Sequence, residues 1–124
     1  MKAALFATAL LLSGSATLAI GQAAPADAAK GLALYRARCA VCHGADSSGG
    51  NGPDLHGIVG RSAASEPDFA YSAALRRSGK TWSAAELQAF LVRPQAAVPG
   101  TRMAFAGAQP AEAAALIAYL KTLK

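Results

Sequence analysis

The chain has 124 residues, with 12 Lys and Arg against 7 Asp and Glu, which gives a net charge of +5. This length allows one small domain and no more. A positive balance on so small a body favours association with acidic surfaces, although an ordinary solvated face would carry the same charge.

The N-terminal stretch has the pattern of a secretory signal peptide. A positively charged start is followed by an apolar run to Ile20 and then by small residues. This order is typical of a signal that is cleaved after Ala26 or Ala28. We therefore divide the chain into a signal peptide, residues 1–28, and one exported domain, residues 29–124. An uncleaved membrane anchor is the alternative, since the apolar run approaches the roughly 20 residues needed to cross a bilayer.

The composition of the exported part predicts an all-α fold. Ala is abundant, and β-branched or aromatic residues do not alternate as they do in strands. The first helix is expected from about Ala28 to Ala40, with Asp27 as its N-cap. Leu32 and Tyr35 are expected to face inward, with Leu34 as a further candidate.

The middle of the chain is expected to alternate loops with short helices. Residues 44–61 are dense in Gly, Ser, Asn and Pro and are predicted to be a loop. A helical turn is expected at residues 72–77. Ser83 and Glu86 form a capping box, which predicts a helix that ends before Pro94. The side chains expected to face inward from this helix are Leu87, Phe90 and Leu91.

The last part of the chain is expected to be a loop followed by a helix. The loop covers residues 94–107, and the helix begins near Pro110, a residue well suited to a first helical position. The side chains expected to face inward from this helix are Leu116, Ile117, Tyr119, Leu120 and Leu123. Helices at both ends with loops between them would form a shell around a flat ligand.

Cys39, Cys42 and His43 form the Cys-x-x-Cys-His motif of haem c attachment. On a helical turn, positions three and four apart share one face, so both thiols and the imidazole can meet one porphyrin. We expect the thiols to form thioethers with the two vinyl groups and His43 to bind the iron. The predicted cofactor is therefore one covalently attached haem c.

Other uses of these residues fit the sequence less well. A thioredoxin-like site would need a βαβ setting, which the chain lacks. Structural zinc needs four ligands, whereas the chain has two Cys and two His, and Cys42 and His43 are adjacent. A plain disulfide between Cys39 and Cys42 is the simplest alternative in an exported protein.

The second axial ligand of the iron is predicted to be Met103. The chain has two methionines, and Met1 is removed with the signal. Met103 lies in an irregular loop, where a side chain can be presented to iron, and a thioether ligand raises the reduction potential. The alternatives are that Met103 fills a gap in the core, or that His56 binds the iron. We expect His56 to be a hydrogen-bonded brace of its loop.

Together these residues resemble the class I cytochromes c, in the branch of mitochondrial cytochrome c and bacterial cytochrome c2. The resemblance extends from Gly31 to Leu123. It is carried by Gly31 and Tyr35, the attachment motif, Gly52-Pro53-Asp54-Leu55-His56-Gly57, Gly60-Arg61, Phe69 and Tyr71, Trp82, Pro99-Gly100-Thr101, Met103, Phe105-Ala106-Gly107 and Leu116-Ile117-Ala118-Tyr119-Leu120. The implied fold has helices wrapped around one haem, with the N- and C-terminal helices crossing.

The resemblance also implies roles for residues that patterning alone does not assign. The carbonyl of Pro53 would accept a hydrogen bond from the free ring nitrogen of His43. Tyr71 and Trp82 would hydrogen-bond a buried haem propionate, with Arg61 nearby to offset its charge. Ordinary aromatic core packing is the alternative for the two rings.

Further positions either follow the family's pattern or depart from it. Thr101 would support the propionate edge, and Gly31 would let the first helix cross the last one closely, against Tyr119. Phe90 stands where the family usually has a Tyr that bonds the ligand methionine, and Leu75 where it often has an Asn near buried water. Both exchanges would make the methionine side of the haem drier.

The sequence therefore predicts a soluble periplasmic single-electron carrier, and not an enzyme, in a respiratory or photosynthetic chain. With iron closed on both faces, no position is open to a small-molecule substrate. The expected partners are membrane-bound redox complexes, a cytochrome bc1-type donor and an oxidase or reaction-centre acceptor, which dock electrostatically and transiently on a monomer; nucleic acid is not expected. The alternatives are a haem subunit of a larger oxidoreductase and a peroxidase or gas-binding haem protein with an open distal site.

Overall fold

The computed structural model describes residues 24–124, and the side chains from Asp27 onward. The predicted signal peptide, residues 1–28, lies outside this part of the chain except for residues 24–28. Between residues 24 and 124 there are six helices and no strand, and one isolated antiparallel bridge pairs Ser62 with Thr81. The predicted all-α fold is therefore confirmed. None of these helices is long and apolar enough to cross a membrane.

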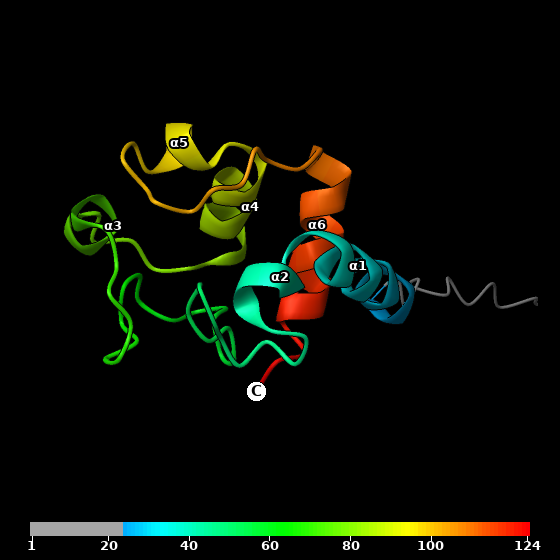
Figure 1. Ribbon diagram of the computed structural model, residues 1–124. Helices are drawn as coiled ribbons and strands as arrows, with labels where there is room; N and C mark the ends of the chain where they lie inside the picture. Colours follow the sequence, from blue (N-terminus) through cyan, green and yellow to red (C-terminus); the bar gives the residue numbers. More distant parts are fainter. Residues whose placement is uncertain (1–23) are drawn as a thin grey trace, which may run out of the picture.

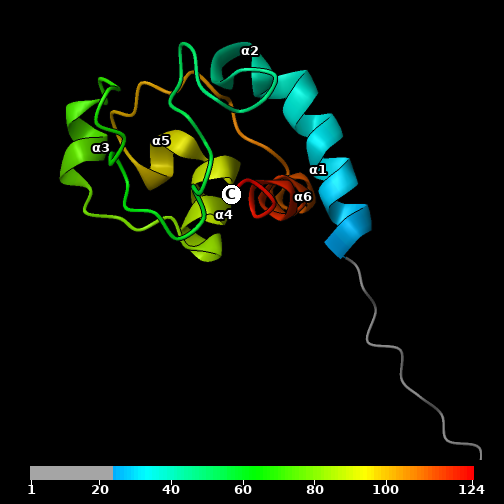
Figure 2. The same cartoon turned by 90° about the horizontal axis from the view of Figure 1, so that it is seen from below.

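Long loops connect the helices, which form two groups. In chain order the helices are α1 (Ala24–Arg38), α2 (Ala40–His43), α3 (Ala73–Arg77), α4 (Ala84–Val92), α5 (Pro94–Ala97) and α6 (Pro110–Leu120). Figure 1 shows α1 crossing α6 on one side of the molecule and α3, α4 and α5 on the other. In the view from below, α6 lies between α1 and α4 (Figure 2), and it packs against both.

The crossing of α1 and α6 is very close. Gly31 of α1 is buried, and a Cβ at this position would lie 1.9 Å from the carbonyl oxygen of Ala115 and 2.8 Å from the Cβ of Tyr119. One turn along α1, the ring of Tyr35 lies 5.1 Å from the ring of Tyr119. The predicted close crossing at Gly31 is confirmed.

The bounds of α1 differ from the prediction at both ends. The helix begins at Ala24 and not at Ala28, so Asp27 lies in its first turn and is not the N-cap. A negative side chain in the first turn still interacts favourably with the positive end of the helix dipole. At the other end α1 stops at Arg38, and a short break at Cys39 separates it from α2. The predicted continuous helix to Ala40 is therefore wrong.

Serine caps start α3 and α4 at the predicted positions. Ser72 Oγ accepts a hydrogen bond from the N–H of Leu75, and Ser83 Oγ accepts one from the N–H of Glu86, both at 3.1 Å. Each cap satisfies an N–H group that the helix leaves unpaired and contributes about 1 kcal/mol. The carboxylate of Glu86, which a full capping box would turn back onto Ser83, forms an ion pair with Lys80 at 2.8 Å.

The region after α4 contains one helix that the sequence did not predict. α5 lies within residues 94–107, which were expected to be a loop throughout. It begins with Pro94, whose missing N–H costs nothing at a first helical position. α6 begins at Pro110 as predicted, but it ends at Leu120, so Leu123 lies beyond the helix.

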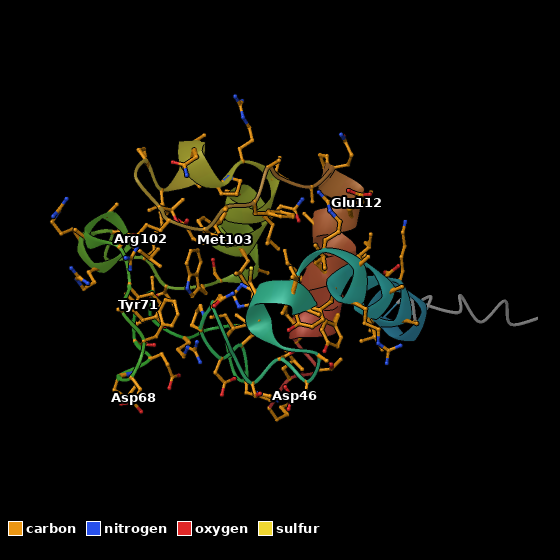
Figure 3. All side chains as sticks on the ribbon, in the orientation of Figure 1. Asp46, Asp68, Tyr71, Arg102, Met103 and Glu112 are labelled. Carbon is orange, nitrogen blue, oxygen red and sulfur yellow. The ribbon has the colours of Figure 1, made fainter. Side chains whose placement is uncertain are left out.

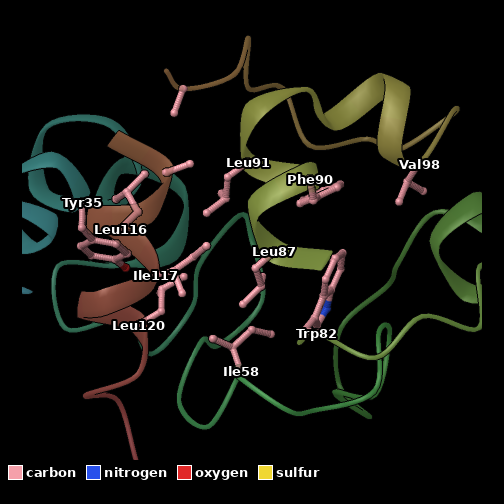
Figure 4. Close-up of a cluster of buried hydrophobic side chains, with 12 residues drawn as sticks. Tyr35, Ile58, Trp82, Leu87, Phe90, Leu91, Val98, Leu116, Ile117 and Leu120 are labelled. Carbon is pink, nitrogen blue, oxygen red and sulfur yellow. The ribbon is translucent and has the colours of Figure 1, made fainter. Parts of the chain in front are cut away.

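The hydrophobic core joins α4, α6 and the long loops (Figure 4). Its large members include the predicted Leu87, Phe90 and Leu91 of α4, the predicted Leu116, Ile117 and Leu120 of α6, and Tyr35, Ile58, Trp82 and Val98. Leu34 packs against this cluster, whereas Leu32 is only half-buried. Several of these side chains also form the wall of the cavity that holds the candidate site.

Candidate functional site

A cavity of about 680 Å³ lies between α2, α4 and the loops around them. Its volume is within the range of roughly 300–1,000 Å³ that small-molecule and cofactor sites occupy. Every predicted site residue lines it, namely Cys39, Cys42, His43, Pro53, Arg61, Tyr71, Trp82, Thr101 and Met103. The fold therefore brings together residues from several distant segments in one mostly apolar chamber.

The two cysteines lie at the break between α1 and α2. Cys39 closes α1 by donating its N–H to the carbonyl of Tyr35 at 2.8 Å, and α2 then carries Cys42 and His43. Cys39 is half-buried and Cys42 is exposed, and they do not form a disulfide with each other. Burial raises the pKa of the Cys39 thiol. In the described part of the chain no three His, Cys, Asp or Glu side chains gather as a metal ion held by protein alone would need.

His43 is held in one orientation by the loop that follows α2. The ring is buried, and its Nδ1 lies 2.9 Å from the carbonyl oxygen of Pro53. Since a carbonyl can only accept, Nδ1 carries the hydrogen and Nε2 keeps its lone pair free for a metal. Gly52 packs directly on the ring, because a Cβ there would lie 2.7 Å from Cε1 and 2.8 Å from Nδ1 of His43.

Gly52→Ala should displace the imidazole of His43 from its hydrogen bond to Pro53. The new methyl group would stand less than 3.0 Å from two ring atoms, so the ring has to rotate or shift. We expect an altered absorption spectrum and a changed midpoint potential in the haem-loaded protein. Gly57→Ala is the control, since a Cβ there meets no atom within 4 Å although its φ of +64° disfavours a side chain. An unchanged spectrum in Gly52→Ala would contradict the packing described.

His56 braces its own loop through Asp54. The backbone N–H of His56 donates to Asp54 Oδ1 at 2.7 Å, and its Nδ1 lies 2.8 Å from the same oxygen. These bonds agree with the expectation that His56 is a loop brace. They also stabilise the charged carboxylate, so the pKa of Asp54 is lowered, first by the backbone bond and then by the ring.

Asp54→Asn should make the free energy of unfolding depend less on pH in the acid range. A carboxylate whose pKa is lower in the folded state stabilises the fold above its unfolded pKa of 3.8, and this contribution disappears as pH falls through the folded value. We expect the variant to be less stable than the parent at pH 6 and to converge with it at the acid end. Urea unfolding at a series of pH values measures this. Asp68→Asn removes the same charge from another loop, and an equal effect there would exclude the bracing role of Asp54.

Arg61 presents an unsatisfied donor in the wall of the cavity. Its two terminal nitrogens donate to the carbonyls of His56 and Asp54 at 2.9 and 2.8 Å. Its Nε is buried and has no partner among the described residues. The guanidinium is therefore a fixed positive charge in the wall of the cavity, which suits a bound group of negative charge. The cavity therefore fits a cofactor that is largely apolar and carries a carboxylate.

Two aromatic side chains line the same cavity as Arg61. The backbone N–H of Trp82 donates to the backbone carbonyl of Arg61 at 2.8 Å, which holds the two residues side by side. Tyr71 is buried, and its hydroxyl accepts from the N–H of Glu66 at 3.3 Å. The hydroxyl hydrogen of Tyr71 thus remains available to an acceptor in the cavity.

The loop that carries Met103 is fixed by hydrogen bonds on both sides of Thr101. Thr101 Oγ1 accepts from the N–H of Met103 at 3.3 Å. Gln95 in α5 donates its Nε2 to the carbonyl of Thr101 at 2.8 Å and accepts from the N–H of Gly100 at 3.3 Å. Figure 3 shows the Met103 side chain near the middle of the molecule, above α2.

Arg38 connects this loop to both terminal helices. Its guanidinium donates to Glu112 Oε2 at 3.1 Å and to the carbonyl of Gly107 at 2.7 Å, and it lies 4.9 Å from the centre of the Phe105 ring. The sequence indicated Arg38 only as one of many surface charges. The sequence predicted neither set of bonds. The hydrogen-bond partners of Arg38 lie 74 and 69 residues away, and those of Gln95 lie in a loop where no regular spacing relates them.

The two departures from the family pattern also lie at the cavity. Phe90 is 6% exposed, and its ring lies 5.0 Å from that of Trp82 at an interplanar angle of 47°. Leu75 is half-buried and lines the same wall. Two apolar side chains therefore line the cavity at the positions where the resemblance implies hydrogen-bonding ones.

Comparisons with known proteins place this site in a family. The family model described as Cytochrome c matches residues 28–124. Cytochrome c of Chlamydomonas reinhardtii is 43% identical over 102 residues, 79% of this chain and 91% of that protein. Cytochrome c2 of Rhodopila globiformis is 42% identical over 107 residues, 84% of this chain and 100% of that protein. The chain belongs to the class I cytochrome c family.

A solved structure agrees with this assignment. Cytochrome cH from Methylobacterium extorquens has 42% sequence identity and a TM-score of 0.72, and the match covers 77% of this chain and 98% of that one. The cofactor of the family is covalently attached haem c, and its members carry electrons. The Cys-x-x-Cys-His motif lies in the wall of the cavity, which is mostly apolar and also includes Arg61, so the residues present fit such a cofactor.

Proposed function

We propose that this cytochrome c is a soluble periplasmic carrier of single electrons, and not an enzyme, with its haem linked to Cys39 and Cys42 and its iron bound by His43 and Met103. The observation that carries the proposal is that all four side chains line one cavity. When bound, haem c supplies an iron that alternates between its ferrous and ferric states.

The side chains of the cavity prepare it for electron transfer in distinct ways. The bond from His43 Nδ1 to Pro53 orients the imidazole and makes Nε2 a better ligand. Thr101 and Gln95 restrain the loop of Met103. Met103 would therefore move little when the charge of a bound iron changes. The apolar walls from α4 and α6 exclude water. Arg61, Tyr71 and Trp82 would neutralise and hydrogen-bond the acidic edge of the haem.

The location follows from the N-terminal sequence and is part of the proposal. Cleavage after Ala26 or Ala28 would shorten α1 by part of its first two turns and leave the rest of the fold as described. The mass of the purified protein tests this. Loss of 26 or 28 residues with one haem added supports a free carrier, whereas a retained N-terminus indicates an anchored subunit.

A reduced-minus-oxidised absorption spectrum tests haem attachment and ligation together. We expect the bands of low-spin haem c, a far-red band of iron–methionine ligation in the oxidised protein, and colour that stays with the polypeptide in acidified organic solvent. Haem that is extracted by the solvent would overturn the proposed attachment. Binding of carbon monoxide to the reduced protein at neutral pH would overturn the proposed second ligand and favour an open distal site.

We propose that redox partners dock over α2. Val41 is 83% exposed and is the only large hydrophobic side chain so exposed among the described residues. It lies between the two cysteines and lines the same cavity as Arg38 and Arg102. An exposed apolar side chain on a protein of net charge +5 suits brief contact with an acidic surface, such as that of a membrane-bound donor or acceptor complex.

Val41→Asp should slow electron transfer with an anionic reaction partner. Hexacyanoferrate(III) serves as the probe, and we expect a severalfold lower bimolecular rate at low salt and a smaller difference at high salt. Ala85→Asp is the control, because it adds the same charge in the first turn of α4, on the far side of the molecule from α2 (Figure 2). Equal effects of the two variants would show that only net charge matters and that α2 is not the docking face.

A further inference from the structure

Glu66 lies beside the guanidinium that faces the cavity. Its Oε2 is 3.7 Å from Arg61 Nη1, and the two side chains are 31% and 21% exposed. Both terminal nitrogens of Arg61 are already bonded to backbone carbonyls, and only Nε lacks a partner. The carboxylate therefore adds negative charge next to a cation that lines the cavity.

The same residue is coupled to a second cavity group through its backbone. The N–H of Glu66 donates to the hydroxyl oxygen of Tyr71 at 3.3 Å, and Tyr71 and Arg61 both line the cavity. Glu66 thus contacts two of the three side chains that would face the acidic edge of the haem, Arg61 and Tyr71. Because the Glu66–Arg61 pair is only partly exposed, salt screens it less than it screens a charge at the surface.

We propose that Glu66 is a positioning residue that lowers the reduction potential of the haem. It does so because the positive charge of Arg61 is shared between the Glu66 carboxylate and the haem propionate. This inference rests on the proposed function. A negative charge near the cofactor stabilises the oxidised form, which carries one more positive charge than the reduced form. The carboxylate of Glu66 also offsets part of the positive charge of Arg61, so Arg61 neutralises the propionate less. Both effects lower the midpoint potential.

Glu66→Gln in the full haem-loaded protein tests the proposal, because it keeps the shape of the side chain and removes its charge. We expect the midpoint potential measured by protein-film voltammetry to rise, and the rise to persist at high salt. Glu66→Asp, which keeps the charge, should restore part of the parent potential. The absorption spectrum should stay unchanged in both variants, since neither touches an iron ligand.

Asp68→Asn is the matched control. Asp68 is an exposed acid in the same loop, and Figure 3 shows it at the outer edge of the molecule below Tyr71. We expect a smaller shift that disappears at high salt. A rise in Asp68→Asn equal to that in Glu66→Gln, or no rise in Glu66→Gln, would overturn the proposal while the parent spectrum still supports a haem c carrier. A parent protein without covalently attached haem would overturn both.

Discussion

Met103→Leu is expected to remove the far-red absorption band of the oxidised protein and to lower its midpoint potential by roughly 0.2 V or more, within the span that axial ligands command. Leu fills nearly the same volume as Met, so the exchange removes the sulfur without leaving a large cavity. Met103 is half-buried and its backbone is held by Thr101, so the loop should keep its course. The reduced variant should bind carbon monoxide at neutral pH.

Leu87→Met provides the control for this exchange. Leu87 is buried in α4 and lines the same cavity, and the reverse substitution there alters packing without removing a proposed ligand. The control should keep the far-red band and a potential close to that of the parent. If Met103→Leu kept both as well, Met103 would be a packing residue and the second axial ligand would have to be sought elsewhere.

Local signals in the sequence were enough to predict α3, α4 and α6. Ser72 and Ser83 cap the next helices through bonds that span three residues, and Pro110 suits a first helical turn, so these starts depend on neighbours in the chain. The inward face of α4 followed from the spacing of Leu87, Phe90 and Leu91.

Elements that depend on weaker or more distant interactions were not predicted. α5 is a helix of four residues, too short for periodicity to reveal, and it is stabilised by contacts of Gln95 with the loop that follows. The early start of α1 lies in a stretch that the sequence assigned to the signal peptide. Neither Gly nor Pro lies at or next to Cys39, so the sequence carries no local signal for the break there.

The candidate site was predicted better than the bonds that support it. The attachment motif is contiguous, and Met103 is the only methionine outside the predicted signal peptide, so both could be proposed from the sequence. The contact of Gly52 with His43, the link from Arg38 to Glu112 and the pair of Glu66 with Arg61 join segments through the folded core. Such contacts depend on tertiary packing, which no spacing in this one sequence reveals.

Gly31→Ala is expected to destabilise the whole domain, even though Ala favours helix over Gly by about 1 kcal/mol in an exposed position. The added Cβ would lie 1.9 Å from the carbonyl oxygen of Ala115, which is backbone and cannot rotate away. α1 must then move off α6, which also separates the rings of Tyr35 and Tyr119. We expect a net loss of about 2 kcal/mol or more in the free energy of unfolding, measured with urea on the haem-loaded protein.

Ala33→Gly makes the opposite exchange at an exposed position two residues further along α1. It should cost only the difference in helix propensity, about 1 kcal/mol, because no packing is altered. The two variants therefore separate the effect of helix propensity from that of the contact between α1 and α6. If the crossing were looser than described, Gly31→Ala would raise the free energy of unfolding by the amount that Ala33→Gly lowers it. A loss in both variants, larger at Gly31, would show that the close approach of α1 and α6 outweighs helix propensity at this position.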